Sequence, residues 1–459
     1  MLYRNGEYGG MQLPRKSVRF FGFRLRSRYI RAMNPLLRIA YEGAGVIAQI
    51  TAELAPHGDS KTLRSMRGRR GIRARYSAWA NAHRDPERAL LWLHAPSVGE
   101  GLQARPVIDI LRLRRPDLQL AYTFFSPSAE EFARSLSVDF SDYLPFDTTL
   151  DAHAALDSLR PAAIVFSKLD VWPVLAQEAS ARGVRLGLIS ATLAPDSSRS
   201  GSVATALLRD AYALLDGVGA VDINDADRLA RLGVRASSVT VTGDTRYDQV
   251  WARAQAADRA GELLSALASD RPTLVAGSTW PSDEAPLLDA WRSLRRAFPT
   301  ARLIIAPHEP TEERLQAIEK WASASNISHS RLALAAAGQR DMILVDRRGV
   351  LGDLYAVATC AFVGGGFHRA GLHSVIEPAA FGVPVLFGPG YKGNRDASSL
   401  IARGEGLSAS SPSEIVTHLA RWLADDGERR TAGELAAAMV RDGLGAAERS
   451  ATLVESLMR

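Results

Sequence analysis

The sequence from 89 to 101 reads ALLWLHAPSVGEG. Its first seven residues are almost all apolar, which is typical of a buried strand. Pro96 and Gly99 then permit a tight turn, and a helical pattern begins around Glu100. A strand, a turn and a helix in this order open a β–α unit, the building block of parallel sheets. The stretch therefore predicts an α/β protein.

The same alternation of strands and helices continues along the chain. Apolar runs of strand length follow at 119–124, 162–166, 184–189, 217–221 and 238–242, and again at 273–277, 302–306, 342–345, 360–363 and 384–387. A long helical pattern at 249–269 separates the two sets. We therefore expect two doubly wound parallel sheets, in domains at 76–260 and 261–459. Ligands of such sheets bind beyond the carboxyl ends of the strands, so the two domains would face a cleft.

Charge is unevenly distributed along the 459 residues. Residues 1–75 hold 16 Lys and Arg against four acids, a net of +12, and the other 384 residues hold 40 bases and 46 acids, a net of −6. A duplex-binding protein needs a basic face on its folded body, so nucleic acid is not an expected partner. The single cysteine, Cys360, excludes an internal disulfide and a multi-cysteine metal site, and it favours a reducing compartment.

The basic N-terminal extension, residues 1–75, is predicted to associate with a membrane. Basic residues alternate with aromatic ones at 15–31, a pattern that suits anionic headgroups. Residues 35–54 are mostly apolar but contain three charges, which favours a helix lying on the bilayer over one that spans it. A solvated tail, or a helix docked on the protein, is the alternative. A second basic run at 61–75 would contact lipid phosphates or form a solvated linker.

Glu100 is the first candidate catalytic residue. It lies in HAPSVGEG, residues 94–101, directly after the first strand of the body. A carboxylate at the carboxyl end of a strand points toward the expected cleft, where burial could raise its pKa and make it a general base. An acid in the first turn also stabilises a helix, so a capping role is the alternative.

A glycine-rich stretch at 364–389 reads GGGFHRAGLHSVIEPAAFGVPVLFGP and follows another strand. Three successive glycines would let a ligand approach the backbone closely. Ser374 and Glu377 have the spacing of a capping box at the start of a helix, and the free N–H groups of a helix start bind phosphate. Glu377 would then be placed for a ribose hydroxyl. A capping box without any ligand is the alternative.

Three cations also follow strands: Lys168 in FSKLDVWP, Arg246 in GDTRYD and His308 in APHEP. In a cleft they would counter the negative charge of a leaving phosphate; on the surface they would form ordinary ion pairs. The sequence contains no GxxxxGK[ST], no HExxH and no GxGxxG after the first strand. P-loop nucleotide hydrolysis, zinc peptidase chemistry and standard NAD binding are therefore not expected.

Six short blocks stand in order along the chain: LWLHAPSVGEG, LDVWP, VTGDTRYD, AGSTWPSDE, APHEP and GLHSVIEPAAFGVPVLFGP. In the same order they resemble W-x-H-A-x-S-V-G-E, ELWP, GNLKFD, AGSTHxGEE, PRHPER and GGHNPLEPAAxGxPVLxGP. These are the motifs of the 3-deoxy-D-manno-octulosonic acid (Kdo) transferases of lipopolysaccharide synthesis. The resemblance covers residues 65–430.

The resemblance implies a GT-B glycosyltransferase that moves Kdo from CMP-Kdo to lipid IVA with inversion, at the cytoplasmic face of the bacterial inner membrane. It implies Glu100 as the general base, with Lys168 and Arg246 as transition-state stabilisers. It implies no metal and no cofactor, CMP-Kdo being a co-substrate. The residues that it places around CMP are Pro307, His308, Arg348, Gly349, Val350, Ser374, Val375, Ile376 and Glu377.

Several positions depart from the family pattern and suggest a divergent branch. The family usually has Glu at the positions of Lys168 and Val350, Arg at that of His308, and Asn at that of Ser374. The acceptor could therefore differ from lipid IVA, and the number of Kdo units added cannot be read from the sequence. Two alternatives stay open. One is another GT-B enzyme with a different nucleotide sugar, and the other is a membrane-associated relative without catalysis.

Overall fold

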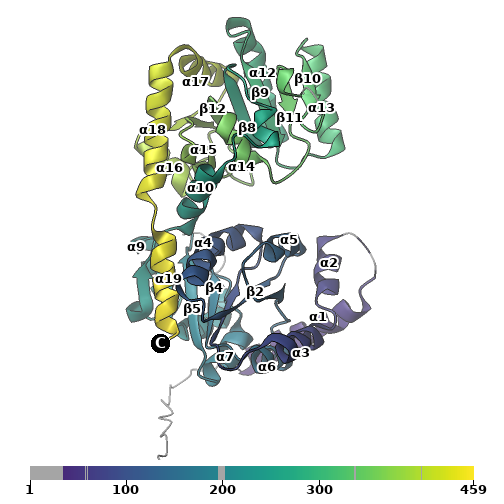
Figure 1. Ribbon diagram of the computed structural model, residues 1–459, viewed down its shortest axis with the longest axis vertical. Coiled ribbons are helices and arrows are strands. Elements are labelled where there is room, and N and C mark those ends of the chain that lie inside the picture. Colours follow the sequence, from purple (N-terminus) through teal and green to yellow (C-terminus); the bar gives the residue numbers. More distant parts are fainter. Residues whose placement is uncertain (1–34, 57, 59, 195–201, 335–336, 405) are drawn as a thin grey trace, which may run out of the picture.

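The computed structural model describes residues 35–56, 58, 60–194, 202–334, 337–404 and 406–459. Two parallel sheets of seven strands each form two domains, one above the other in Figure 1. This confirms the predicted fold, two doubly wound α/β domains. The aromatic and basic stretch at 15–31, predicted to meet anionic headgroups, lies outside the described residues.

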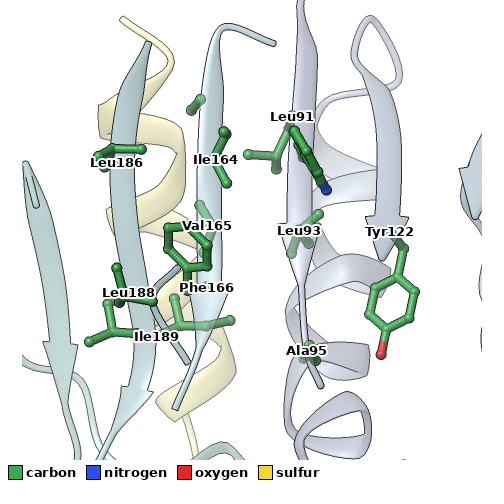
Figure 2. Close-up of a cluster of buried hydrophobic side chains, with 14 of the residues drawn as sticks. Leu91, Leu93, Ala95, Tyr122, Ile164, Val165, Phe166, Leu186, Leu188 and Ile189 are labelled. Carbon is green, nitrogen blue, oxygen red and sulfur yellow. The ribbon is translucent and has the colours of Figure 1, made fainter. Parts of the chain in front are cut away.

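The first sheet has the strand order β3-β2-β1-β4-β5-β6-β7. Its strands are β1 (Leu90–His94), β2 (Gln119–Phe124), β3 (Phe140–Tyr143), β4 (Ala163–Ser167), β5 (Arg185–Ala191), β6 (Gly217–Ala220) and β7 (Val239–Val241). Its helices are α3 (Ile72–His83), α4 (Val98–Arg114), α5 (Glu130–Arg134), α6 (Thr149–Leu159), α7 (Pro173–Ala181), α8 (Ser202–Ala213) and α9 (Ile223–Arg231). Helices cover both faces of a parallel sheet, so its central strands bury side chains on both sides. Figure 2 shows Leu91, Ile164 and Leu188 in this core.

The second sheet has the strand order β10-β11-β9-β8-β12-β13-β14. Its strands are β8 (Thr273–Thr279), β9 (Arg302–Pro307), β10 (His329–Arg331), β11 (Met342–Leu344), β12 (Cys360–Val363), β13 (Val385–Phe387) and β14 (Gly406–Ser408). Its helices are α12 (Pro281–Ala297), α13 (Glu312–Ala324), α14 (Leu351–Leu354), α15 (Ile376–Ala380), α16 (Arg395–Ala402), α17 (Pro412–Ala424) and α18 (Asp426–Asp442). Trp291 and Phe362 lie in its core.

Every apolar run predicted as a strand forms one, whereas β3, β10 and β14 were not predicted. All three are edge strands, and their sequences, FSDY, HSR and GLS, contain few apolar residues. An edge strand has a neighbour on one side only, so its sequence need not form a continuous apolar run.

The single helix predicted at 249–269 is wrong. The structure has α10 (Thr245–Ala256) and the short α11 (Glu262–Ser265), separated by a turn. The Asp258 carboxylate accepts a hydrogen bond from the Ala260 N–H at 3.1 Å, and the Gly261 N–H donates to the Asp258 carbonyl at 3.0 Å. An aspartate that binds nearby backbone groups in this way competes with the helix.

The C-terminal helix α19 (Ala446–Leu457) returns to the first domain, as the end of the yellow segment in Figure 1 shows. It packs against α4, β5 and β6, and Ala451, Val454 and Leu457 are buried in the core of the first sheet. Gly445, in a left-handed conformation with φ of 87°, separates α19 from α18. The C-terminal residues of the chain therefore pack against the sheet of the first domain.

Candidate active site

Glu100 lies in the first turn of α4, directly after β1. Its carboxylate accepts a hydrogen bond from the Ser97 hydroxyl, and the Lys168 ammonium lies 3.5 Å from its Oε1 atom. The Glu100 side chain is 20% exposed, so it is shielded from bulk solvent and still reachable. Ser97 is the N-cap of α4, yet its hydroxyl makes no bond to the helix backbone. The structure therefore brings two of the predicted catalytic residues, Glu100 and Lys168, into one pair.

Lys168 follows β4 in a left-handed backbone conformation, with φ of 66°. Its backbone N–H donates to the Ile189 carbonyl on β5 at 2.8 Å. A φ of this kind is uncommon outside glycine and costs about 1–3 kcal/mol, so the surrounding structure must hold it. Strained residues of this kind cluster at functional sites. The position of Lys168 beside Glu100 fits that pattern.

Next to this pair, a hydrogen-bonded group joins the ends of β1, β2 and β4. His94 contacts Thr123 Oγ1 through Nδ1 at 3.0 Å and Asp170 Oδ2 through Nε2 at 3.3 Å. The Trp172 indole N–H lies 3.1 Å from both His94 Nε2 and Asp170 Oδ2. His94 is buried. Sequence reasoning did not single out these residues, although His94, Asp170 and Trp172 lie in quoted motifs. They fix the strand ends that carry the candidate base.

Arg246, the third predicted catalytic residue, is bound at the domain boundary. It lies in the first turn of α10 and pairs with Asp244 Oδ2 at 2.6 Å and Asp396 Oδ2 at 3.0 Å. Asp396 lies on α16 of the second domain. Burial alone would lower the pKa of Arg246, but the two carboxylates raise it. Arg246 is therefore a firmly charged, paired cation in this conformation.

The glycines at 364–366 pack against other loops of the protein. A Cβ atom added to each would meet a backbone atom, at 2.3 Å from Ser278 O for Gly364, 2.2 Å from Gly371 O for Gly365 and 2.5 Å from Gly388 Cα for Gly366. Real Cβ contacts are not this short, so only glycine fits here. Close packing between loops is sufficient to explain these glycines. The close approach of a ligand, expected from the sequence, stays a prediction.

Asp283 holds the same loop in place. Its buried carboxylate accepts hydrogen bonds from the backbone N–H groups of Gly365, Phe367 and Trp280, at 2.8, 2.9 and 2.9 Å. Buried carboxylates are stable when several N–H groups point at them. Asp283 is thus a structural residue of the second domain that sequence reasoning missed.

The capping box predicted for Ser374 and Glu377 is not formed. The five-residue helix α15 has Val375 as its N-cap, without a side-chain hydrogen bond to the helix. Burial raises the pKa of Glu377, and the charge of Arg253 and the Ser374 hydroxyl oppose the rise. Val375 and Ile376 are fully buried, backbone included, so neither is accessible to a nucleotide in this conformation.

His308 belongs to a cluster of stacked rings around Trp280. The Trp280 ring centroid lies 4.7 Å from that of His308 and 4.1 Å from that of His368. The Trp280 indole N–H donates to His373 Nε2 at 3.0 Å, and His373 stacks on His308 at 4.5 Å. Trp280 stands where the AGSTHxGEE motif has a histidine. Among the described residues, no three or more His, Cys, Asp or Glu side chains are arranged to hold a metal ion.

The other predicted nucleotide residues follow strands of the second sheet. Pro307 ends β9, and Val350 is the N-cap of α14. The Arg348 side chain is 67% exposed, with its guanidinium 3.7 Å from Glu309, and the Gly349 carbonyl accepts from Arg253. The strands β11, β9, β8 and β12 are consecutive neighbours in the sheet. Parallel strands all end on the same side of a sheet. The structure thus brings these residues, and the stretch at 374–377, to the side where the carboxyl ends of the strands lie.

Helix α1 (Pro35–Leu54) binds the first domain through its polar side. Tyr41 donates to Asp147 at 2.9 Å, and Arg38 pairs with Glu178 at 2.8 Å. Large apolar side chains on α1 are exposed, namely Leu36, Ile39, Val46, Ile47, Ile50 and Leu54. A surface helix normally buries its apolar side, so α1 has the reverse orientation. No helix in the described part of the chain has the length and hydropathy to cross a membrane.

Several side chains of the basic run at 61–75 bind other parts of the protein. Arg69 is buried and donates to backbone carbonyls, and Arg73 and Arg75 pair with Asp151 at 3.1 Å and Asp142 at 2.7 Å. The run forms α2 (Lys61–Gly68) and the start of α3. It is therefore folded onto the first domain, and the expectation of a solvated linker is wrong.

Known proteins with similar sequences identify the family. A family model described as 3-Deoxy-D-manno-octulosonic-acid transferase (kdotransferase) matches residues 69–249. A 3-deoxy-D-manno-octulosonic acid transferase of Bordetella pertussis is 30% identical over 383 residues, 81% of this chain and 88% of that protein. The chain belongs to the Kdo transferase family. It is a Kdo glycosyltransferase of lipopolysaccharide synthesis. A relative in Chlamydophila psittaci is 30% identical over 74% of this chain and 78% of that protein. A relative in Haemophilus influenzae is 26% identical over 71% of this chain and 77% of that protein.

Solved structures agree on the fold of this Kdo transferase. The UDP-GlcNAc 2-epimerase from Neisseria meningitidis bound to UDP-GlcNAc superposes with a TM-score of 0.59 at 15% identity, covering 81% of this chain and 99% of that one. A UDP-N-acetylglucosamine 2-epimerase from Listeria monocytogenes gives 0.59 at 13% identity, covering 80% and 96%. At these identities the likeness shows the GT-B type of fold and nothing about the substrate.

Proposed function

We propose that this Kdo transferase moves Kdo from CMP-Kdo to lipid IVA, with inversion at the anomeric carbon. The observation that carries the proposal is the Glu100–Lys168 pair, a partly buried carboxylate beside a cation at a strand end, in a member of the Kdo transferase family. The nucleotide would lie beyond β9, β11 and β12, at Pro307, at 348–350 and at 374–377. The proposal includes no metal and no other cofactor.

Glu100 acts as the general base in this scheme. It takes the proton from an acceptor hydroxyl as that oxygen attacks the anomeric carbon of Kdo, and CMP leaves with the electrons of the broken bond. Lys168 supplies positive charge beside the base, where the family pattern has a glutamate. Arg246 is the second proposed cation, for the negative charge that develops on the leaving phosphate.

We further propose that the protein works at the cytoplasmic face of the inner membrane, held there by α1. The exposed apolar side of α1 would enter the headgroup region while its polar side stays bound to the first domain. Helix α2 packs beside α1 and carries the exposed side chains of Lys61 and Arg64, which would meet lipid phosphates. An enzyme held in this way is close to an acylated acceptor such as lipid IVA.

The donor is the part of the proposal that a binding panel tests. Thermal shift of the purified protein with CMP-Kdo, CMP, UDP-GlcNAc and UDP should show stabilisation by the two cytidine compounds only. Stabilisation by a uridine compound instead would point to another GT-B enzyme with a different nucleotide sugar. Binding of CMP-Kdo without any transfer to lipid IVA would favour a different acceptor or a relative without catalysis.

A further inference from the structure

Arg246 already has an anionic partner across the domain boundary. Its guanidinium lies 3.0 Å from Asp396 Oδ2, and the Tyr247 hydroxyl donates to Asp396 Oδ1 at 3.0 Å. Both oxygens of Asp396, on α16, therefore bind side chains of α10. Asp396 is 3% exposed, whereas the Arg246 side chain is 36% exposed. A solute can therefore reach the cation, while its partner is hidden.

The neighbouring residue makes a second contact between the domains, with the charges reversed. Arg395 lies 3.0 Å from Asp222 Oδ2 and 2.9 Å from Asp225 Oδ2, both in the first domain. Asp225 is fully buried. The start of α16 thus binds the first domain twice, once through a base and once through Asp396. The second domain stays attached through Arg395 if the contact of Asp396 opens.

The two carboxylates on Arg246 are not equally tied to it. Asp244 is the N-cap of α10 and accepts from the Arg246 backbone N–H at 3.0 Å, from Nε at 2.9 Å and from Nη2 at 2.6 Å. Asp396 is held by Nη1 and comes from the other domain. A guanidinium presents its N–H groups in one planar fork. The two carboxylates use three of its five N–H groups, and Asp396 has the weaker hold of the two. An incoming anion that binds through Nη1 therefore competes with Asp396.

We propose that Asp396 is a resident anion, which occupies Arg246 until an anionic group of the donor displaces it. The inference rests on the proposed function, because the anion is taken to be the phosphate of CMP-Kdo. It makes Asp396 a positioning residue, which acts on the donor through Arg246 and ties the arrival of the donor to the contact between α10 and α16. In the motif GNLKFD, Asn and Phe stand where this chain has Asp244 and Tyr247.

The test compares the affinity for CMP of wild type and Asp396→Asn by isothermal titration calorimetry. Asparagine keeps the size of the side chain and can still accept from Tyr247, but it no longer competes for Arg246 by charge. We expect CMP to bind Asp396→Asn about tenfold more tightly, within the usual range of coupling between sites. Adding Arg246→Gln should remove the gain. Arg395→Gln is the matched control, since it breaks the adjacent domain contact without touching Arg246, and it should leave the affinity unchanged.

Several outcomes would overturn the inference. The first is an unchanged or weaker affinity of Asp396→Asn for CMP at an unchanged thermal midpoint. The second is an equal gain in Arg395→Gln, which would show that loosening the domains, and not charge, is the cause. If Asp396→Asn does not fold, Tyr247→Phe loosens Asp396 without changing charge, and the absence of any gain there has the same meaning. A wild type that binds UDP and not CMP overturns the proposed donor together with the inference, whereas CMP binding without a gain overturns the inference alone.

Discussion

A substitution at Glu100 should affect the chemical step without affecting the binding of the donor. Replacing it with glutamine keeps the side chain's size but removes the proton acceptor. We expect Glu100→Gln to lower Kdo transfer by about 10²–10⁴-fold, the usual effect of losing a general base. The affinity for CMP should not change, because Glu100 is proposed to act on the acceptor and CMP is proposed to bind the second domain and Arg246. Initial rates measure the loss of transfer, and calorimetry measures the affinity for CMP. Transfer at the wild-type rate would rule Glu100 out as the base.

The contribution of Asp147 to the stability of the protein depends on pH. Its buried carboxylate accepts hydrogen bonds from the Val174 and Leu175 N–H groups and from the Tyr41 hydroxyl. Burial raises the pKa of Asp147 to about 6. Because the folded protein then binds this proton more tightly than the unfolded chain, the contribution of Asp147 to stability falls as the pH rises from about 4 to about 6.

Asp147→Asn should remove this pH dependence. On going from pH 7 to pH 4.5, we expect wild type to gain about 2 kcal/mol of unfolding free energy relative to the variant. Urea unfolding of both proteins at the two pH values measures the difference. Since other carboxylates titrate in both proteins, only the difference counts, and parallel pH curves would contradict the prediction.

Residue identity alone predicted part of the candidate site. Glu100 and Lys168 could be named because each follows an apolar run, and strands of one parallel sheet end at one edge. The partner of Arg246 could not be named, because Asp396 lies 150 positions away and in the other domain. The cluster around Trp280 was missed for the same reason, since its rings come from separate loops.

At the scale of elements, apolar runs predicted the inner strands well, because those strands are covered on both faces. They did not predict the edge strands β3, β10 and β14, such as FSDY in β3, or the turn at Asp258 that divides the helix expected at 249–269. The orientation of α1 on the protein could not be predicted from the sequence either. Its composition suggested a helix on a bilayer, but which side binds the protein depends on partners such as Asp147, about a hundred residues later.

The exposed side of α1 gives a prediction about membrane binding. Ile39, Ile47 and Ile50 are 69, 67 and 56% exposed, so changing all three to glutamine should leave the thermal midpoint unchanged. Each apolar side chain that enters the bilayer contributes about 1.5–3 kcal/mol, so the triple variant should sediment with anionic vesicles much less than wild type. Leu113→Gln, at an exposed apolar position on α4, is the matched control and should bind like wild type.

Equal sedimentation of the triple α1 variant and wild type would reject this role of α1. Substitution is a cleaner test than deleting residues 1–60. Deletion would also remove Tyr41, which donates to the buried carboxylate of Asp147, and a buried acceptor without its donor lowers stability.

At the scale of the whole molecule, α19 joins the end of the chain to the first sheet. Leu457 is buried, and a Cβ atom on Gly187 of β5 would lie 2.6 Å from its Cδ1 atom. Leu457→Ala should therefore lower the free energy of unfolding by about 2–5 kcal/mol. Leu435→Ala, at a position on α18 that is 41% exposed, should have a much smaller effect. Denaturant unfolding measures both, and a similar small loss for the two variants would mean that α19 is not part of the core.

The most direct test of the central claim is product analysis by mass spectrometry. Full-length wild type and Glu100→Gln are incubated side by side with CMP-Kdo and lipid IVA in anionic vesicles. Wild type should convert lipid IVA to a Kdo-bearing lipid and release an equal amount of CMP, and the variant should do both at least about 100-fold more slowly. Equal conversion by both proteins, or CMP release by wild type without any Kdo on the lipid, would contradict the account.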